Sequence, residues 1–184
     1  MVDISTLTTN RLILRQWLPS DYSIFSRINA DSDVMKYYLS VLTESESNRF
    51  AKKAESLISK KGWGFWAVEL KEDNSFIGFV GLHEPEADLP FTPCVEIGWR
   101  LSKKYWGKGY ATEAARAALN YAFDVLQLNE VVSFASLQNA KSKSVMERLK
   151  MENVMQNFEH PSIPEGHHLR EHVLYKINKA MWAG

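Results

Sequence analysis

Cysteine is nearly absent from this 184-residue chain, which carries a single thiol, Cys94. One cysteine excludes an internal disulfide and fits a reducing compartment. An excess of one charge is also missing: 22 Lys and Arg balance 22 Asp and Glu, so nothing attracts the chain to nucleic acid or an anionic membrane. There is no run of about 18 apolar residues to cross a bilayer, and the N-terminus lacks the apolar core of a signal peptide. We therefore expect a cytoplasmic protein with neither a nucleic-acid nor a membrane partner.

Internal repeats, low-complexity tracts and linker-like segments are absent as well. The composition, 45% hydrophobic and 24% charged, is that of an ordinary globular protein. A chain of this length can bury a sizeable core without disulfides or a structural metal. We expect one domain that spans residues 1–184.

Strand-like and helix-like segments are mixed along the chain. Helical periodicity and capping residues predict helices at 18–30, 43–61, 111–126 and 139–151. Because parallel strands need a crossover, we expect helix 111–126 to connect two parallel central strands. The sequence predicts an α/β (α+β) fold with about four helices around a mixed sheet. Its seven strands are expected at 11–17, 65–70, 76–82, 94–101, 131–137, 154–159 and 171–177.

A bare turn, Trp106-Gly107-Lys108-Gly109-Tyr110-Ala111, separates the fourth strand from the third helix. Glycines ahead of a helix leave several backbone N–H groups pointing the same way with no side chain in front of them. The helix dipole and Lys108 add positive charge, so the turn is a candidate phosphate site.

Three phosphate-binding motifs compete for this turn. A Walker loop fails twice, because Ser102 and Gly109 stand where it needs a glycine and a hydroxyl residue. The dinucleotide fingerprint fits weakly, since Thr112 takes its last small position. The acyl-CoA pyrophosphate loop, Gln/Arg-x-x-Gly-x-Gly/Ala, matches at Gly109 and Ala111 and departs at Trp106.

Three ordered stretches, "TTNRLILRQW", "VEIGWRLSKKYWGKGYATEA" and "NAKSKSVMERLKM", cover nearly the whole chain. Together they resemble the GCN5-related N-acetyltransferases (GNAT), most closely the ribosomal-protein N-terminal (RimJ/RimL-like) branch. The resemblance implies the GNAT fold with splayed central strands, acetyl-CoA as co-substrate, and no metal. Lys150 departs from the family pattern, since it stands where a helix-ending glycine is usual.

The resemblance also implies how acetyl-CoA is held. The pantetheine arm would pair with the backbone of Arg100, Leu101 and Ser102, and Asn139 would fix the pantetheine or its thiol end. Asn139 has an alternative role as a helix cap. The N–H groups of Lys108, Gly109, Tyr110, Ala111, Thr112 and Glu113 would hold the pyrophosphate, and Trp106 and Gly107 of the same turn are also expected to bind the cofactor.

Transfer to an amine needs a base and a proton donor for the leaving thiolate. Glu96 is the candidate base, with solvation or pairing to Arg100 as the structural alternative. Ser142 is the candidate proton donor, with helix capping as its alternative. Two family residues are missing: Met146 replaces a tyrosine used as acid, and Phe134 a glutamate used as base by some N-terminal acetylating members. Cys94 is interpreted as an incidental thiol, not a nucleophile.

Four histidines, His160, His167, His168 and His172, match no metal-binding spacing. We expect their loop to line the acceptor pocket instead. The opposite wall is expected among the aromatic residues Tyr37, Tyr38, Trp63 and Trp66.

The acceptor amine is left open by these residues. The family resemblance implies the N-terminus of a ribosomal protein. A small-molecule amine (a polyamine, an antibiotic or an amino-acid-like compound) is the alternative, since a neutral chain does not favour basic proteins. A non-catalytic acyl-CoA-binding module is a third reading. The residues also leave open whether the chain forms a homodimer.

Overall fold

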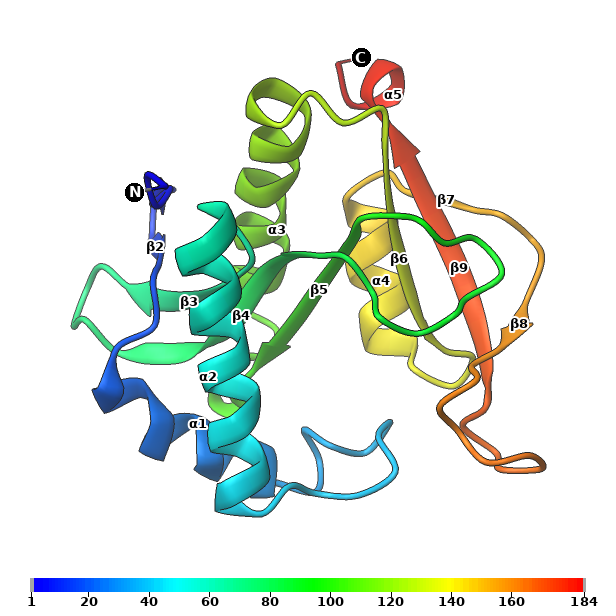
Figure 1. The fold of residues 1–184 in the computed structure, drawn as a ribbon, viewed down its shortest axis with the longest axis horizontal. Coiled ribbons are helices and arrows are strands. Elements are labelled where there is room, and N and C mark those ends of the chain that lie inside the picture. The colour runs from blue at the N-terminus through cyan, green and yellow to red at the C-terminus, as the bar shows by residue number, and fades with distance from the viewer. Residues whose placement is uncertain (1, 184) are drawn as a thin grey trace.

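A computed structural model describes residues 2–183, which form one sheet between two layers of helices (Figure 1). The strand order is β1-β2-β3-β4-β5-β6-β9-β7, and β8 pairs with β9. All neighbours are antiparallel except β5 and β6. The strands are β1 (Leu7–Thr8), β2 (Leu12–Arg15), β3 (Phe65–Leu70), β4 (Phe76–His83), β5 (Glu96–Leu101), β6 (Glu130–Ser136), β7 (Glu152–Asn153), β8 (Phe158–Glu159) and β9 (Glu171–Asn178).

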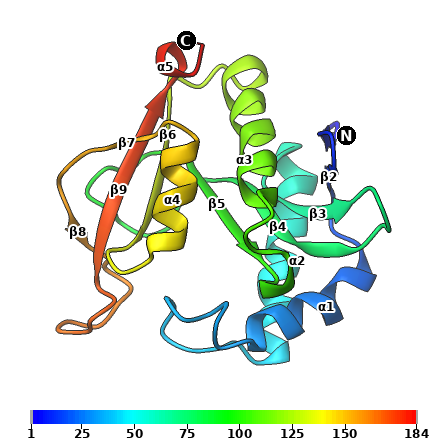
Figure 2. The same cartoon turned by 180° about the vertical axis from the view of Figure 1, so that it is seen from behind.

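Helices α1 (Pro19–Ala30) and α2 (Glu44–Lys61) cover one face of the sheet. Helices α3 (Tyr110–Asn120) and α4 (Ala140–Arg148) cover the other, as the reverse view in Figure 2 makes clear. A π-helical turn at Tyr121–Val125 extends α3, and a short α5 (Lys179–Ala183) ends the described chain. The four predicted helices are thus present, with α5 as an unpredicted fifth.

Local signals explain where α2 begins and ends. The Thr43 hydroxyl accepts a hydrogen bond from the Glu46 N–H, and the Glu46 carboxylate accepts one in return from the Thr43 N–H. This capping box satisfies N–H groups that would otherwise lack a partner. At the other end Gly62 adopts a left-handed conformation with φ 82°, which favours glycine. The inner stripe of α2 buries Ala51, Ala54 and Ile58.

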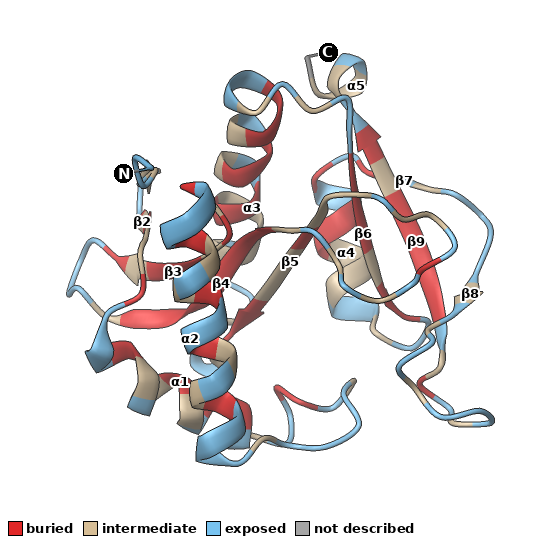
Figure 3. Cartoon of the chain, viewed as in Figure 1, coloured by how far each residue is buried: buried red, intermediate tan, exposed pale blue. Residues whose placement is uncertain are grey.

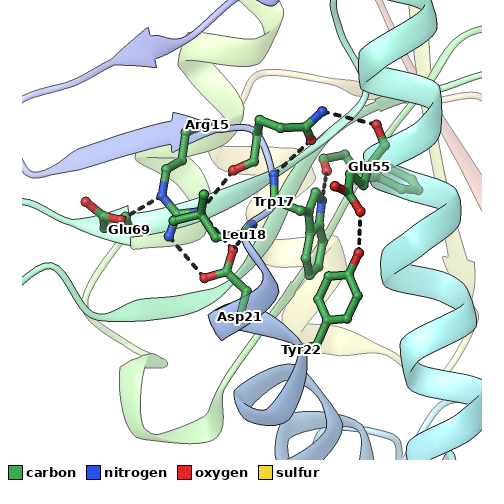
Figure 4. Close-up of polar contacts among 9 residues, drawn as sticks. Arg15, Trp17, Leu18, Asp21, Tyr22, Glu55 and Glu69 are labelled. Carbon is green, nitrogen blue, oxygen red and sulfur yellow. Dashed lines mark hydrogen bonds and ion pairs between the residues drawn. The ribbon is translucent and has the colours of Figure 1, made fainter.

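An ion-pair network fixes α1 against the sheet (Figure 4). The Arg15 guanidinium on β2 contacts Asp21 at 2.8 Å and Glu69 of β3 at 2.6 Å. The Asp21 carboxylate also accepts a hydrogen bond from the Leu18 N–H, so one buried acid both caps α1 and pairs with β2. Tyr22 of α1 donates to Glu55 of α2, which joins the two helices.

The core lies on both faces of the central strands (Figure 3). Seven of the eight residues of β4 are buried, because this strand is covered by α1 on one side and α3 on the other. The α3 face that meets the sheet is built of alanines, including Ala114, Ala115 and Ala118, each fully buried. Small side chains allow the α3 backbone to lie close to the strands.

The two central parallel strands separate almost at once. β5 and β6 share a single register pair, Glu96 opposite Val132, after which they diverge (Figure 1). Two bonds hold the junction: the Val132 N–H donates to the Val95 carbonyl, and the Ser133 hydroxyl donates to the Ile97 carbonyl, each at 3.0 Å. The predicted mixed α/β sheet with splayed central strands is therefore confirmed.

Two details of the sheet differ from prediction. β1 was not predicted, and the single strand expected at 154–159 is wrong. Met155 adopts φ 59° and its N–H bonds to the Asn153 side chain, so the chain turns there and only the flanking pairs join β9 as β7 and β8. The sheet has nine strands instead of seven.

Lys150, which follows α4, has φ 60°, the left-handed conformation that a helix-ending glycine would adopt.

Candidate active site

A cavity of about 1010 Å³ lies where the splayed strands, the glycine turn and the helix termini meet. It is lined by the segment between α1 and α2, the end of β5, the start of α3 and the start of α4. Twelve of the fourteen predicted site residues line it: Arg100, Leu101, residues 106–113, Asn139 and Ser142. Residues far apart in sequence thus meet around one space.

Ser102 and Glu96 do not line this cavity. The Ser102 N–H already donates to the Ile77 carbonyl, and the Ser102 carbonyl accepts from the Tyr105 N–H, both at 2.9 Å. The Ser102 N–H is therefore already used within the fold, and the pairing of the Ser102 backbone with pantetheine stays a prediction.

The backbone groups of successive β5 residues face β4 and β6 in alternation. Val95 and Ile97 direct their carbonyls toward β6. Because successive residues of a strand point their backbone groups to opposite neighbours, Trp99 and Leu101 face the open splay while Arg100 faces β4. The sequence predicted Leu101 at this open edge. It also placed the Arg100 backbone there, which remains a prediction although this backbone faces β4, and it did not include Trp99 among the cofactor-binding residues.

Both glycines of the turn are in the left-handed region, with φ 74° at Gly107 and φ 80° at Gly109. A Cβ added at Gly107 would meet nothing within 4 Å, so the backbone there is open. The N–H groups of Tyr110, Ala111 and Thr112 begin α3 and have no partner within the helix. This arrangement of exposed donors at a helix N-terminus suits a phosphate.

A clamp from the N-terminal hairpin holds the turn in place. The Arg11 guanidinium contacts the Glu113 carboxylate at 2.7 Å and donates to the Lys108 carbonyl at 3.0 Å. The Thr9 hydroxyl donates to the same carboxylate at 2.7 Å. Burial acts to raise the pKa of Glu113, but the hydrogen bonds from Thr9 and Arg11 outweigh it and hold this pKa below the ordinary value. The Glu113 side chain therefore positions the turn.

Positive charge is concentrated around the cavity although the chain is neutral overall. The two acidic residues in its lining are both paired, Asp33 with Lys103 and Glu113 with Arg11. The six basic residues in the lining are Lys36, Arg100, Lys108, Arg116, Lys141 and Arg148. Net charge gave no signal of this distribution, because it averages over the whole surface.

Asn139 and Ser142 stand together at the start of α4. The Asn139 side-chain oxygen accepts from the Ser142 N–H at 3.1 Å, so Asn139 is the helix cap that the sequence offered as an alternative role. Both residues also line the cavity. Met146, which replaces the family tyrosine, is 1% exposed and belongs to the core.

Glu96 lies on the side of β5 that faces α1 and α2. It is half-buried, and burial raises the pKa of its carboxyl to about 7. Within residues 2–183 nothing donates a hydrogen bond to this carboxylate, and Arg100 bonds to Asn29 instead. The nearest residue in register on β4 is His83. The predicted base thus has the environment of a carboxylate that titrates near neutral pH.

The His-rich loop does not line the cavity, contrary to expectation. His160 and His172 pack instead against Phe134 and Phe158 in an aromatic cluster. Among residues 2–183, no group of three His, Cys, Asp or Glu side chains is placed to hold a metal. Burial raises the pKa of the Cys94 thiol to about 11, which makes it a poor nucleophile at neutral pH.

Two of the four aromatic residues predicted for the acceptor wall lie at the cavity. Tyr37 and Tyr38 line the cavity, whereas Trp63 and Trp66 do not. Trp66 is fully buried and donates its indole N–H to the Ser5 carbonyl, so it belongs to the core.

No helix in the described range 2–183 has the length and apolar character that a membrane span requires.

Comparison with known proteins agrees with this geometry. The model of the Acetyltransferase (GNAT) domain family matches residues 11–152. The uncharacterized N-acetyltransferase YnaD of Bacillus subtilis is 29% identical over 177 residues, which are 96% of this chain and 98% of that protein. The crystal structure of a GNAT-family acetyltransferase from Bacillus anthracis superposes with a TM-score of 0.79 at 29% identity, over 96% of this chain and 99% of that one.

An acetyltransferase from Agrobacterium tumefaciens gives a TM-score of 0.77 at 27% identity, over 97% of this chain and 96% of that one. The family match covers well over half of the chain and includes β2 through α4. The protein therefore belongs to the GNAT family of N-acetyltransferases, enzymes that use acetyl-CoA as the acetyl donor.

Proposed function

We propose that this enzyme transfers an acetyl group from acetyl-CoA, bound in the 1010 Å³ cavity, directly to a primary amine. The observation that carries this proposal is the continuity of two backbone surfaces. The edge of β5 at Trp99 and Leu101, where the Leu101 carbonyl accepts from the Trp106 indole N–H at 2.9 Å, leads into the N–H groups at the start of α3. An extended pantetheine arm ending in a pyrophosphate needs such a sequence of donors.

On the donor side, the turn from Gly107 to Thr112 would hold the pyrophosphate through its N–H groups and Lys108. Arg116 and Arg148 would add positive charge beside it, since both line the cavity. The amide nitrogen of Asn139 has no partner among residues 2–183 and is available to the pantetheine arm, while its oxygen caps α4.

On the chemical side, the attacking amine must first lose a proton. Glu96 would accept it, directly or through water, since its pKa near 7 allows it to be ionised at neutral pH. The N–H groups of Trp99 or Leu101 would stabilise the negative charge that develops on the acetyl oxygen. The new C–N bond replaces the C–S bond. The proton that the nitrogen loses as it becomes an amide would pass to the leaving thiolate through the Ser142 hydroxyl, which gains one proton as it gives one up.

For the acceptor, the names of relatives point in two directions. The putative ribosomal N-acetyltransferase YdaF of Bacillus subtilis is 38% identical over 77 residues, 42% of this chain, which supports the RimJ/RimL-like branch. An FsC-acetyl coenzyme A-N(2)-transacetylase of Aspergillus fumigatus is 35% identical over 133 residues, 67% of this chain. Two Vibrio cholerae structures, a putative ribosomal-protein-serine acetyltransferase and a spermidine N-acetyltransferase with CoA and spermine, share the fold at 17% and 18% identity. One fold thus serves both acceptor classes, and the fold alone selects neither.

The test is an acceptor screen by mass shift with acetyl-CoA. It should cover peptide N-termini, polyamines and amino acids, with a Glu96→Gln variant as the matched control. Acetylation of at least one acceptor by the wild type, and much slower acetylation by the variant, would support the proposal. Tight binding of acetyl-CoA with no acceptor acetylated would favour the non-catalytic acyl-CoA-binding reading.

A further inference from the structure

Arg100 is a buried cation that has no acidic partner among residues 2–183. Its side chain leaves β5 on the α1 and α2 face and is 8% exposed. One guanidinium nitrogen donates to the Asn29 side-chain oxygen at 2.8 Å. Its Nε is buried and bonds to nothing in residues 2–183, and no carboxylate of the described chain forms an ion pair with it.

Aromatic rings account for only part of the environment of Arg100. The guanidinium carbon lies 4.3 Å from the centre of the Tyr38 ring, 5.4 Å from that of Phe50 and 5.6 Å from that of Phe79. Such contacts stabilise a cation modestly, whereas removing a cation from water costs much more unless an anion accompanies it. Arginine presents a planar fork of donors that fits the two oxygens of a carboxylate. A carboxylate would match this environment, and residues 2–183 supply none to Arg100.

The position of Arg100 connects this site to the acceptor. Arg100 lines the cavity together with Tyr37 and Tyr38. It stands between Trp99 and Leu101, whose backbone groups form the open edge at which the thioester is proposed to lie. Resting on the proposed function, we propose that Arg100 binds a carboxylate of the acceptor, so that the substrate is an amino-acid-like amine and not a polyamine or a plain protein N-terminus.

The cofactor is a less suitable source of this anion. Its phosphates have their own donors at the N-terminus of α3, on the opposite face of the sheet from α1 and α2 (Figures 1 and 2). The Arg100 side chain contacts Asn29 of α1 and Phe50 of α2, so it points away from the phosphate end. A polyamine is disfavoured for another reason, because a second cation beside an unpaired guanidinium is repelled.

The test compares amino acids with their amides, which keep the amine and the shape but lose the negative charge. Wild-type kcat/KM should favour the acid over the matched amide by roughly tenfold or more, as expected for charge-assisted hydrogen bonds. Arg100→Met should remove this preference. Arg100→Lys, which keeps the charge and loses the fork, should retain part of it. Arg116→Met is the matched control: it removes a cation from the phosphate end of the cavity and should weaken acetyl-CoA binding without changing the acid-to-amide ratio.

Three results would overturn the inference. The first is equal kcat/KM of the wild type for acids and amides, or a preference for peptide amides or polyamines. The second is an unchanged acid-to-amide ratio in Arg100→Met with lost acetyl-CoA affinity, which would assign the anion to the cofactor. The third is a ratio that falls equally in Arg116→Met, which would indicate a general electrostatic effect.

Binding of the products separates this inference from the proposed function. N-acetyl amino acids and their N-acetyl amides can be compared by thermal shift in the presence of CoA, with no turnover required. A shift for the acids that is absent in Arg100→Met would support the carboxylate site even if no acceptor were acetylated. No shift for either class in the wild type would overturn it, whatever the acceptor screen finds.

Discussion

The two ends of the cavity are built in different ways. The end at which we propose that the phosphates bind consists mainly of backbone: two left-handed glycines, the first N–H groups of α3 and the edge of β5. The proposed acceptor end consists of side chains: Arg100 on β5 and Tyr37 and Tyr38 from the segment after α1 line the cavity, and Glu96 lies outside this lining, four residues before Arg100 on β5. The first can bind the same cofactor in many relatives, since backbone groups do not depend on side-chain identity. The second can change its acceptor by a few substitutions.

The largest effect is expected at the acceptor end, for Glu96→Gln. Loss of a general base typically costs about 10² to 10⁴ in rate. Wild-type kcat/KM should rise with pH through about 7, because burial raises the pKa of Glu96 to about 7 and only the ionised form accepts a proton. The deficit of the variant should shrink as pH approaches the pKa of the amine.

Steady-state rates between pH 6 and 9 measure this effect, and acetyl-CoA affinity should stay unchanged. Glu130→Gln, at an exposed carboxylate of β6 paired with Lys176, is the matched control. A variant with the wild-type pH profile would make Glu96 a structural residue and direct the search to His83.

A smaller loss is expected at the phosphate end, for Gly109→Asp. Any side chain is strained at φ 80°, and its Cβ would lie 3.5 Å from the Arg11 guanidinium. An aspartate there would compete with Glu113 for Arg11 and place negative charge beside the phosphates. We expect acetyl-CoA affinity to fall at least about tenfold, roughly 1.4 kcal/mol, in a calorimetric titration.

Gly166→Asp provides the control, because Gly166 has φ 75° in open space away from the cavity. It introduces the same strain and charge and should leave affinity unchanged. Equal affinities for both variants and the wild type would remove the turn from the donor site.

A several-fold effect is expected for Arg11→Met, which breaks the clamp without touching the cavity lining. The turn should lose order, and the KM for acetyl-CoA should rise about three- to tenfold, while kcat stays near the wild-type value. In a double-mutant cycle with Glu113→Gln, the two losses should be less than additive, because both remove the same contact. Full additivity would show that Arg11 and Glu113 act separately.

The smallest effect is expected when residues 162–168 are replaced by a Gly/Ser linker. No residue of the His-rich loop lines the cavity. Acceptor KM and acetyl-CoA affinity should therefore each change less than about threefold, under about 0.7 kcal/mol. A larger rise in acceptor KM alone would extend the acceptor end to this loop.

The same contrast explains what could be predicted from the sequence. The glycine turn is a local motif, so its residues predicted a phosphate site, and the cavity that they line, without knowledge of the fold. Helix α2 was predicted closely for a similar reason, because Thr43 and Gly62 signal its ends within a few residues. The alternation of residues along a strand could have predicted that the backbone of Trp99, and not that of Arg100, faces the gap between β5 and β6. This inference needs the pairing of β5 with β4 and β6, which the sequence does not give.

The acceptor end depends on contacts between distant residues. Arg100 meets Asn29 across 71 residues and contacts the rings of Tyr38 and Phe50. No local sequence pattern predicts such a cluster. The net charge of zero also gives no indication that basic residues line the cavity. The strand expected at 154–159 failed because Met155 takes a left-handed conformation that its side chain does not signal.

The single register pair between β5 and β6 has a thermodynamic consequence. The sheet consists of two antiparallel units, β1 to β5 and β6 to β9, which share this one parallel pair. A molecule bound between the diverging strands β5 and β6 would contact both units and hold them together. A ligand that binds only the folded chain stabilises it by about 2.7 kcal/mol at a hundred times its Kd. The melting temperature should therefore rise with the concentration of acyl-CoA. This measurement needs no acceptor, so it can be made before the acceptor is identified.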